Sequence, residues 1–99
     1  LYEANIILGA AHYYLGNKNQ ADKFLSPSLN KEAPNLRILL LLSDLYMMDN
    51  NTEKLVFMLD GLDYLKITDI DTLLAVGRLY SLAGEHNKSL EVLYHAIAL

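Results

Sequence analysis

The chain repeats itself with a 34-residue period, and this internal repeat limits the possible folds more than any other feature of the sequence. Three units, at about 2–34, 35–68 and 69–99, cover nearly the whole chain and form one predicted domain spanning 1–99. The sets of residues in register are Leu8, Leu42 and Val76; Gly9, Ser43 and Gly77; His12, Tyr46 and Tyr80; Gly16, Asn50 and Gly84; Ala21, Leu55 and Ser89; Leu25, Leu59 and Leu93; and Ser28, Leu62 and Ala96.

Within each unit the apolar residues recur at helical spacing, which predicts two helices per unit. Residues that tolerate a left-handed backbone separate the two helices, at Gly16, Asn50 and Gly84. Asn35 and Asp69 suit the start of the next unit. The sequence therefore predicts an all-α fold of six antiparallel helices, at about 2–15, 18–29, 35–49, 52–65, 69–83 and 86–98.

Two details of the predicted helices depend on single residues. Pro27 falls inside the second helix, where it removes a hydrogen bond and clashes with the preceding turn, so we expect that helix to kink or stop near Ser26. Gly9, Ser43 and Gly77 fall mid-helix, where glycine costs roughly 1 kcal/mol relative to alanine. Close approach of the second helix would offset this cost, and the tyrosines one turn later would fill the adjoining space.

A 34-residue helical hairpin with Leu-Gly, a later aromatic residue and then Gly-Asn or Gly-Glu resembles the tetratricopeptide repeat, TPR. The third unit matches best, through Val76-Gly77-Arg78-Leu79-Tyr80 and Gly84-Glu85, and the resemblance covers about residues 2–99. The departures are Asn5, Leu39 and Leu73 where the family often has Trp, His12 in place of an aromatic residue, and a shifted or missing Pro. The resemblance implies a right-handed superhelix whose first helices line a concave binding groove.

Carried over residue by residue, the resemblance implies a mostly apolar groove with a few charges. The Lys, Arg and Asn that clamp a terminal carboxylate in some relatives have no counterparts here, so we expect a partner's amphipathic helix or extended apolar segment instead. Simple packing of Tyr13, Met47 and Met48 between repeats is the alternative. The predicted groove residues are Glu3, Ile6, Ala10, Tyr13, Tyr14, Arg37, Leu40, Leu41, Asp44, Met47, Met48, Asp71, Leu74, Arg78, Ser81 and Leu82.

Composition argues against several other classes of function. With 8 Lys+Arg against 12 Asp+Glu the net charge is -4, whereas nucleic-acid-binding proteins usually carry a basic patch. The chain has no cysteine, and the longest strongly apolar run, 38–42, is too short to cross a membrane. We therefore expect a cytoplasmic protein that binds neither nucleic acid nor membrane.

Catalytic and metal-binding patterns are also missing from the sequence. His12, His86 and His95 have no metal-ligand spacing, and His12 is interpreted as a core filler. The carboxylate pairs Asp60 with Asp63 and Asp69 with Asp71 fall at helix ends, where surface placement explains them. No glycine-rich phosphate loop occurs. The sequence predicts no enzyme, no cofactor and no metal site.

The leading hypothesis is a non-catalytic module that binds a segment of another protein. Its narrowest form is a small cytoplasmic chaperone similar to the TPR chaperones of bacterial type III secretion, and the alternative is a TPR fragment of a larger scaffold or assembly protein in a secretion or export system. The last helix, 90–99, is apolar on more than one side. Arrays of this kind usually end in a polar face, so we expect further repeats, a partner or a second copy to cover it, as in a hetero- or homodimer.

Overall fold

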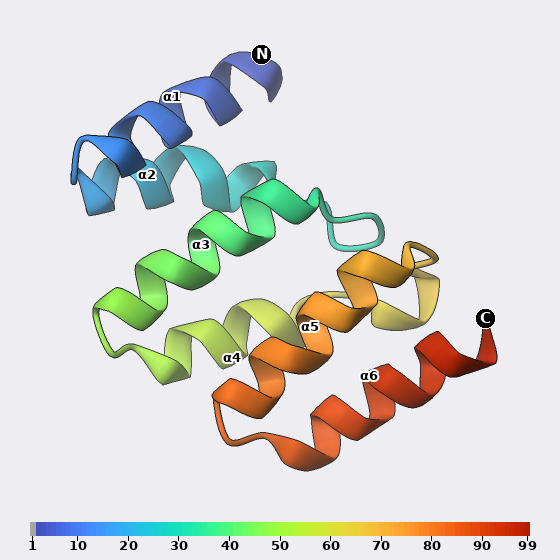
Figure 1. Ribbon diagram of the computed structural model, residues 1–99. Coiled ribbons are helices and arrows are strands. Elements are labelled where there is room, and N and C mark those ends of the chain that lie inside the picture. The colour runs from blue at the N-terminus through green and yellow to red at the C-terminus, as the bar shows by residue number, and fades with distance from the viewer. Residues whose placement is uncertain (1) are drawn as a thin grey trace.

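The computed structural model describes residues 2–99, which form six α-helices and two short 3₁₀ helices with no β-strand in that range. The helices pair as hairpins, α1 with α2, α3 with α4 and α5 with α6 (Figure 1). The molecule measures 38 × 28 × 17 Å. This confirms the predicted all-α class. The helices are α1 (Tyr2–Tyr14), α2 (Lys18–Leu25), α3 (Leu36–Met48), α4 (Thr52–Asp60), α5 (Ile70–Leu82) and α6 (His86–Ala98), with η1 (Ser26–Ser28) and η2 (Tyr64–Lys66) between hairpins.

The 34-residue period reappears in the backbone. The first helices begin at residues 2, 36 and 70 and the second helices at 18, 52 and 86. Each hairpin turn contains one residue with positive φ, namely Gly16 at 81°, Asn50 at 53° and Gly84 at 83°. In each turn the next amide donates to the carbonyl five residues earlier over 2.8 Å, a Schellman closure that satisfies an orphan carbonyl of the first helix. The predicted turn chemistry is confirmed in all three units.

The starts of the second and third units are capped as the sequence predicts. The Asn35 side chain accepts hydrogen bonds from the amides of Arg37 and Ile38, at 2.9 and 3.2 Å. The Asp69 carboxylate accepts from the amide of Thr72 at 3.1 Å. Both caps satisfy amides that have no partner within their helix.

Two of the second helices are shorter than their predicted ranges. The chain leaves α2 at Leu25 and enters η1 with Pro27 in its first turn, which confirms the stop expected near Ser26. The predicted helix 52–65 is wrong beyond Asp60. There the Leu62 amide bonds to the Leu59 carbonyl at 3.0 Å, and the Asp63 amide bonds across to the Lys31 carbonyl at 2.8 Å. That cross-connection replaces the next helical hydrogen bond, so α4 ends and η2 follows.

The core runs through the hairpins and across the junctions between them. A Cβ on Gly9 would lie 2.5 Å from Leu25 Cγ, and a Cβ on Gly77 would lie 2.7 Å from Leu93 Cδ2. The close approach predicted for the first and third hairpins is therefore confirmed. The middle hairpin differs, because Ser43 is buried there with its hydroxyl bonded to the Leu39 carbonyl at 2.7 Å, and the backbones of α3 and α4 approach each other at fewer points.

Candidate functional site

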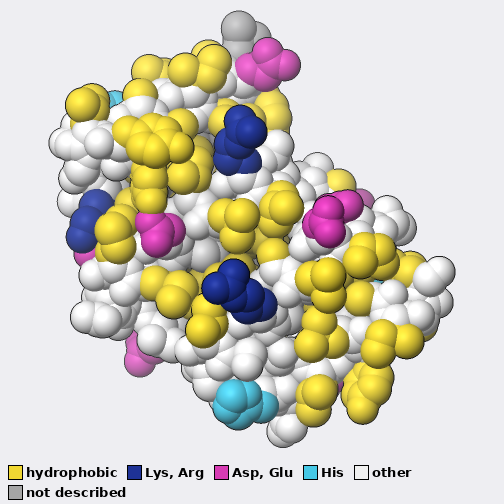
Figure 2. Space-filling view, viewed as in Figure 1, with side chains coloured by type: hydrophobic (Ala, Val, Ile, Leu, Met, Phe, Trp, Pro, Cys, Tyr) yellow, Lys and Arg dark blue, Asp and Glu magenta, His cyan; other side chains and the backbone are white. Residues whose placement is uncertain are grey.

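The first helices of the three hairpins, α1, α3 and α5, lie in sequence across the molecule and present one common surface, which we call the first-helix face (Figure 1). Figure 2, from the same viewpoint, shows hydrophobic side chains spread over this face with basic and acidic side chains among them. Leu40 and Met48 on α3 and Leu74 and Leu82 on α5 are exposed. These are large apolar side chains that the chain's own packing leaves in water.

An open hollow of about 620 Å³ lies on the first-helix face between α1 and α3. Its lining is Tyr13, Leu36, Arg37, Leu40, Leu41 and Asp44, and all except Leu36 belong to the predicted groove. The sequence therefore located the residues around this hollow.

Two polar groups of the hollow are already joined to each other. The Tyr13 hydroxyl donates a hydrogen bond to the Asp44 carboxylate and so links α1 to α3. This hydrogen bond, with burial second, raises the pKa of Tyr13 above its ordinary value. Arg37 has no acidic partner within 4.0 Å among residues 2–99. The hollow thus offers a guanidinium beside an apolar wall.

The remaining predicted groove residues occupy the same face but lie outside the hollow. Tyr13 packs between α1 and α3, as the alternative interpretation held, whereas Met47 and Met48 stay largely exposed. Half-buried residues outside the hollow are Ile6 and Ala10, and exposed ones are Glu3, Tyr14, Met47, Met48, Asp71, Leu74, Arg78, Ser81 and Leu82.

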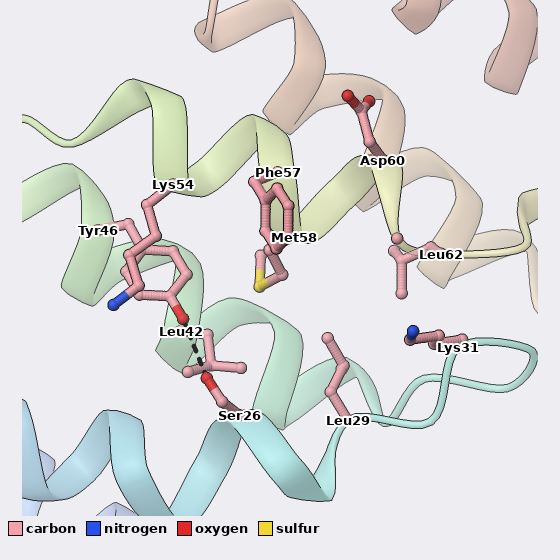
Figure 3. A pocket seen from close by; sticks show the side chains of 11 residues that line it. Ser26, Leu29, Lys31, Leu42, Tyr46, Lys54, Phe57, Met58, Asp60 and Leu62 are labelled. Carbon is pink, nitrogen blue, oxygen red and sulfur yellow. Dashed lines mark hydrogen bonds between the residues drawn. The ribbon is translucent and has the colours of Figure 1, made fainter.

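A second pocket, of about 450 Å³, lies among η1, α3 and α4, and the sequence analysis missed it (Figure 3). Buried Leu42 and Leu62 contribute apolar lining, and Phe57 is 81% exposed at its edge. Leu42 lies on roughly the opposite side of α3 from Leu40, because two residues turn an α-helix by about 200°. Pro27, which ends α2 early, is a sequence signal that points to this opening, whereas the early end of α4 after Asp60 follows from a contact between loops and has no local signal.

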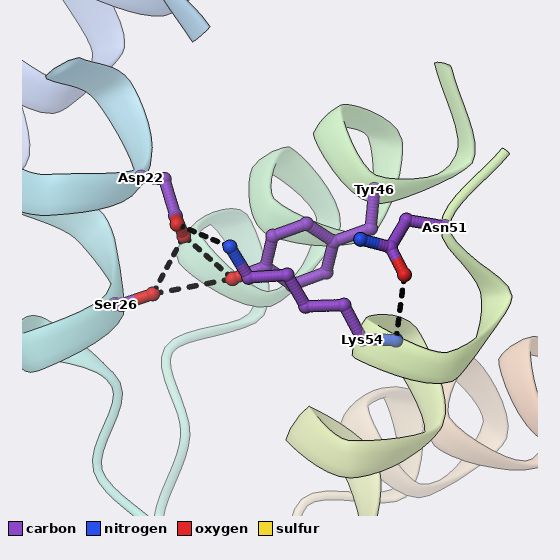
Figure 4. A network of polar contacts seen from close by, with 5 residues as sticks. All are labelled: Asp22, Ser26, Tyr46, Asn51 and Lys54. Atoms are coloured by element: carbon purple, nitrogen blue, oxygen red, sulfur yellow. Dashed lines mark hydrogen bonds and ion pairs between the residues drawn. The ribbon is translucent and has the colours of Figure 1, made fainter. Parts of the chain in front are cut away.

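A polar network holds the second hairpin to the first (Figure 4). The Asp22 carboxylate accepts hydrogen bonds from the Tyr46 hydroxyl at 2.6 Å, Ser26 Oγ at 2.7 Å and Lys54 Nζ at 2.7 Å. Burial would raise the pKa of Asp22, but these three hydrogen bonds outweigh it and lower the pKa. Burial, together with the bond to Asp22, raises the pKa of Tyr46 to about 12.

An equivalent network holds the third hairpin to the second. The Asp60 carboxylate accepts from the Tyr80 hydroxyl at 2.7 Å and from Lys88 Nζ at 3.0 Å. Burial and this carboxylate raise the pKa of Tyr80. Asp60 lies exposed at the end of α4, as the sequence predicts, but it also joins two hairpins, which the sequence analysis did not foresee. The repeat pattern did not reveal the network because the donors follow the 34-residue period but the acceptors do not. The first unit has Ser26 at the position of Asp60, and its carboxylate, Asp22, lies one helical turn earlier.

The three histidines lie apart from one another. His12 stacks on the Phe24 ring at 5.7 Å between centroids, as a filler would, and His86 is exposed. His95 Nε2 lies 3.2 Å from the Ile67 carbonyl oxygen. Within residues 2–99 no three His, Cys, Asp or Glu side chains gather closely enough to hold a metal ion. None of the described helices has the length and apolar character needed to cross a membrane.

Comparison with known proteins adds no relative, since no family model, curated protein or solved structure matches this chain.

Proposed function

We propose that this protein is a non-catalytic interaction module that binds an apolar helical or extended segment of another protein on the first-helix face. The observation that carries the proposal is the row of exposed apolar side chains around the 620 Å³ hollow, including Leu40, Met48 and Leu74. Unpartnered apolar surface of this kind, bordered by polar groups, is typical of sites where another chain docks. Methionine adapts its shape to different apolar partners, which suits Met47 and Met48 to such a surface.

The charges of the hollow favour a particular orientation of the bound segment. Asp44 is engaged by Tyr13, whereas Arg37 keeps its donors available for an acceptor on the partner. A segment with apolar side chains toward α3 and a carboxylate toward Arg37 would satisfy both features. Arg37 is the one basic residue among the six that line the hollow, so this arrangement differs from a multi-residue clamp for a terminal carboxylate.

The finer assignments belong to the same proposal. We infer a short right-handed superhelix of three TPR hairpins, supported by the three equivalent Schellman turns and the constant 34-residue spacing of the helix starts. A small chaperone of type III secretion type is the narrowest form, and a TPR portion of a larger scaffold is the alternative. A gene that ends at Leu99 and a stable one-to-one complex in the source cell would favour the chaperone, and further repeats at the same spacing would favour the scaffold.

Selection of peptides from a displayed library on the purified chain tests the binding surface. We expect enriched peptides to be amphipathic or apolar, with an acidic residue at one side. Their binding should be lost in the double variant Leu40→Glu and Met48→Glu, while helicity is kept because both side chains are exposed and surface changes rarely exceed about 0.5 kcal/mol.

Phe57→Glu is the matched control, since it places the same charge on an exposed apolar residue beside the second pocket. Peptides that bind the first-helix face should bind this variant as well as the original chain. Loss of binding in Phe57→Glu, with binding kept in the double variant, would move the site to the pocket among η1, α3 and α4.

A further inference from the structure

The outer side of α1 carries Leu8 at a position that is buried in the other first helices. Leu8 is 44% exposed, whereas Leu42 and Val76, in the same register, are fully buried beneath the preceding hairpin. Leu15, just after α1, is 74% exposed. The first hairpin thus presents the side that α3 and α5 turn toward the preceding hairpin, and within residues 2–99 no other hairpin packs on it.

The outer side of α6 presents the complementary surface. Leu90 and Tyr94 are 50% and 67% exposed, and they stand in register with Val56 and Asp60 of α4. Val56 and Asp60 face the third hairpin, because both line a hollow of about 380 Å³ with Ala83 and Asp60 also bonds to Tyr80. The exposed side of α6 is therefore the side with which a second helix covers the next unit.

The residue pairs at the two internal junctions predict which residues of α6 and α1 would meet at a third junction. Val56 and Ala83 border one hollow at the second junction, and their counterparts Asp22 and Asp49 border one at the first. The next pair in this series is Leu90 with Leu15, two exposed leucines at opposite ends of the molecule. Contact between the two ends would remove both of these leucine side chains from water.

The residues that form the polar network within the molecule are replaced at both of its ends. Tyr46 and Tyr80 have His12 as their counterpart in the first unit, and Lys54 and Lys88 have Gln20. At the other end Tyr94 replaces the carboxylate of Asp60. At the positions of the polar network, a junction between these ends would contain a tyrosine hydroxyl, an imidazole and an amide, so these positions bury no unpaired charge. A unit carrying the usual tyrosine and lysine would instead meet Tyr94 where it needs a carboxylate.

We propose that the chain stacks head to tail on a second copy of itself, with the outer side of α6 in one copy covering the outer side of α1 in the next. The contact is heterologous, since each copy contributes a different surface. It leaves both unused ends free to continue, so association is open unless the rotation closes a ring. The first-helix face stays uncovered, so this stacking is independent of the proposed partner binding.

Sedimentation equilibrium of the purified 99-residue chain at pH 8 tests the proposal. The average mass should rise with concentration and pass the mass of a dimer. Leu15→Asp and Leu90→Asp should each weaken association at least about tenfold, because each removes a buried leucine and buries a charge. Both changes install the residue found in register in another unit, Asp49 and Asp22, so both variants should fold, which circular dichroism checks.

Mixing the two variants separates head-to-tail stacking from other arrangements. Leu15→Asp keeps its α6 side and Leu90→Asp keeps its α1 side, so the mixture should form a one-to-one dimer and nothing larger. A symmetric α6-to-α6 dimer would leave Leu15→Asp dimeric and the mixture without a new complex, which would overturn the proposal. A monomeric original chain at millimolar concentration would overturn it too, as would loss of association in Phe57→Glu, which lies outside both surfaces.

Discussion

The outer hairpins and the middle hairpin share one register but pack differently. In α1 with α2 and in α5 with α6, a glycine lets the backbones come together, whereas Ser43 holds that position between α3 and α4. Helix length does not explain the difference, because α2 has 8 residues and α4 has 9. A single hydroxymethyl group at the crossing point thus accompanies a looser hairpin, and the 450 Å³ pocket opens beside that hairpin.

The middle hairpin is stabilised from outside instead. Tyr46 and Lys54 tie it to Asp22 of the first hairpin, and Asp60 ties it to Tyr80 and Lys88 of the third. Hydrogen bonds to a charged acceptor contribute more than neutral ones. The outer hairpins therefore depend on internal close packing, and the middle one depends on its two junctions.

Adding a methyl group to an outer hairpin should have the largest effect. Gly77→Ala places a Cβ 2.7 Å from Leu93 Cδ2, so α5 and α6 must separate or Leu93 must shift. Overpacking costs about 1 to 3 kcal/mol, and alanine's better helix propensity offsets about 1 kcal/mol of it. We expect the free energy of unfolding to fall by up to about 2 kcal/mol in urea denaturation, as the difference between these two effects.

The controls for this substitution lie in the partner helix and in the middle hairpin. Leu93→Ala should remove the obstacle, so Gly77→Ala introduced in that background should cost little or even stabilise. Ser43→Ala should stay within about 0.5 kcal/mol, since it removes one intrahelical side-chain bond and gains helix propensity. Stabilisation by Gly77→Ala in the original chain would contradict the close approach.

Removing one tyrosine hydroxyl tests the junctions. Tyr80→Phe deprives Asp60 of one of its two partners, and Tyr46→Phe leaves Asp22 with both Ser26 and Lys54. We expect losses of about 1 kcal/mol for Tyr80→Phe and less for Tyr46→Phe. Urea denaturation measures both, and equal losses would mean that Ser26 adds nothing to the first junction.

The dependence of stability on pH should report the same network at a smaller scale. The folded pKa of Tyr46, about 12, exceeds the ordinary value of about 10, so its stabilising effect is complete below pH 10 and lost as pH rises through 12. The Asp22 and Lys54 side chains of this network are partly exposed, which keeps the effect below about 1 kcal/mol. Tyr46→Phe should therefore reduce the loss of stability between about pH 10 and 12. Urea denaturation at each pH measures this change in the free energy of unfolding.

In the acid range, stability should change with pH in the opposite direction, falling as the pH falls. The pKa of Asp22 is lower in the folded state, so its contribution is present above about pH 4 and is lost as pH falls through the lowered value. Asp22→Asn should make stability less dependent on pH below about pH 5. An unchanged pH dependence in the acid range would show that other carboxylates govern acid unfolding.

The sequence predicted the parts of the fold that follow a local rule. Gly16, Asn50 and Gly84 indicate left-handed turns, and Pro27 indicates the end of α2, because each acts on its own backbone. The early end of α4 could not be predicted this way, since it depends on the Asp63 amide meeting the Lys31 carbonyl, which belongs to the connection before α3. The acceptor roles of Asp22 and Asp60 were missed for a similar reason. The two carboxylates are not one 34-residue period apart in the sequence, yet each accepts a hydrogen bond from the tyrosine of the next unit.

For the candidate site, the sequence located most of the hollow between α1 and α3 but not the pocket among η1, α3 and α4. Tyr13, Leu40 and Asp44 were carried over from the groove positions that the tetratricopeptide resemblance implies, and these keep a fixed place on a regular helix. The second pocket exists because two helices end early, and that depends on contacts between loops that no pattern within a helix records.

The smallest expected effect concerns Phe57, which distinguishes the middle hairpin from the outer ones. Its counterparts in register are Lys23 and Glu91, and its own side chain is 81% exposed. Phe57→Glu therefore removes little buried area, and we expect the free energy of unfolding to change by less than about 0.5 kcal/mol in urea denaturation. A loss above about 1 kcal/mol would mean that the ring covers the floor formed by Leu42 and Leu62 in solution. The pocket would then be closed, and the looser middle hairpin would be packed after all by a residue that the outer hairpins do not need.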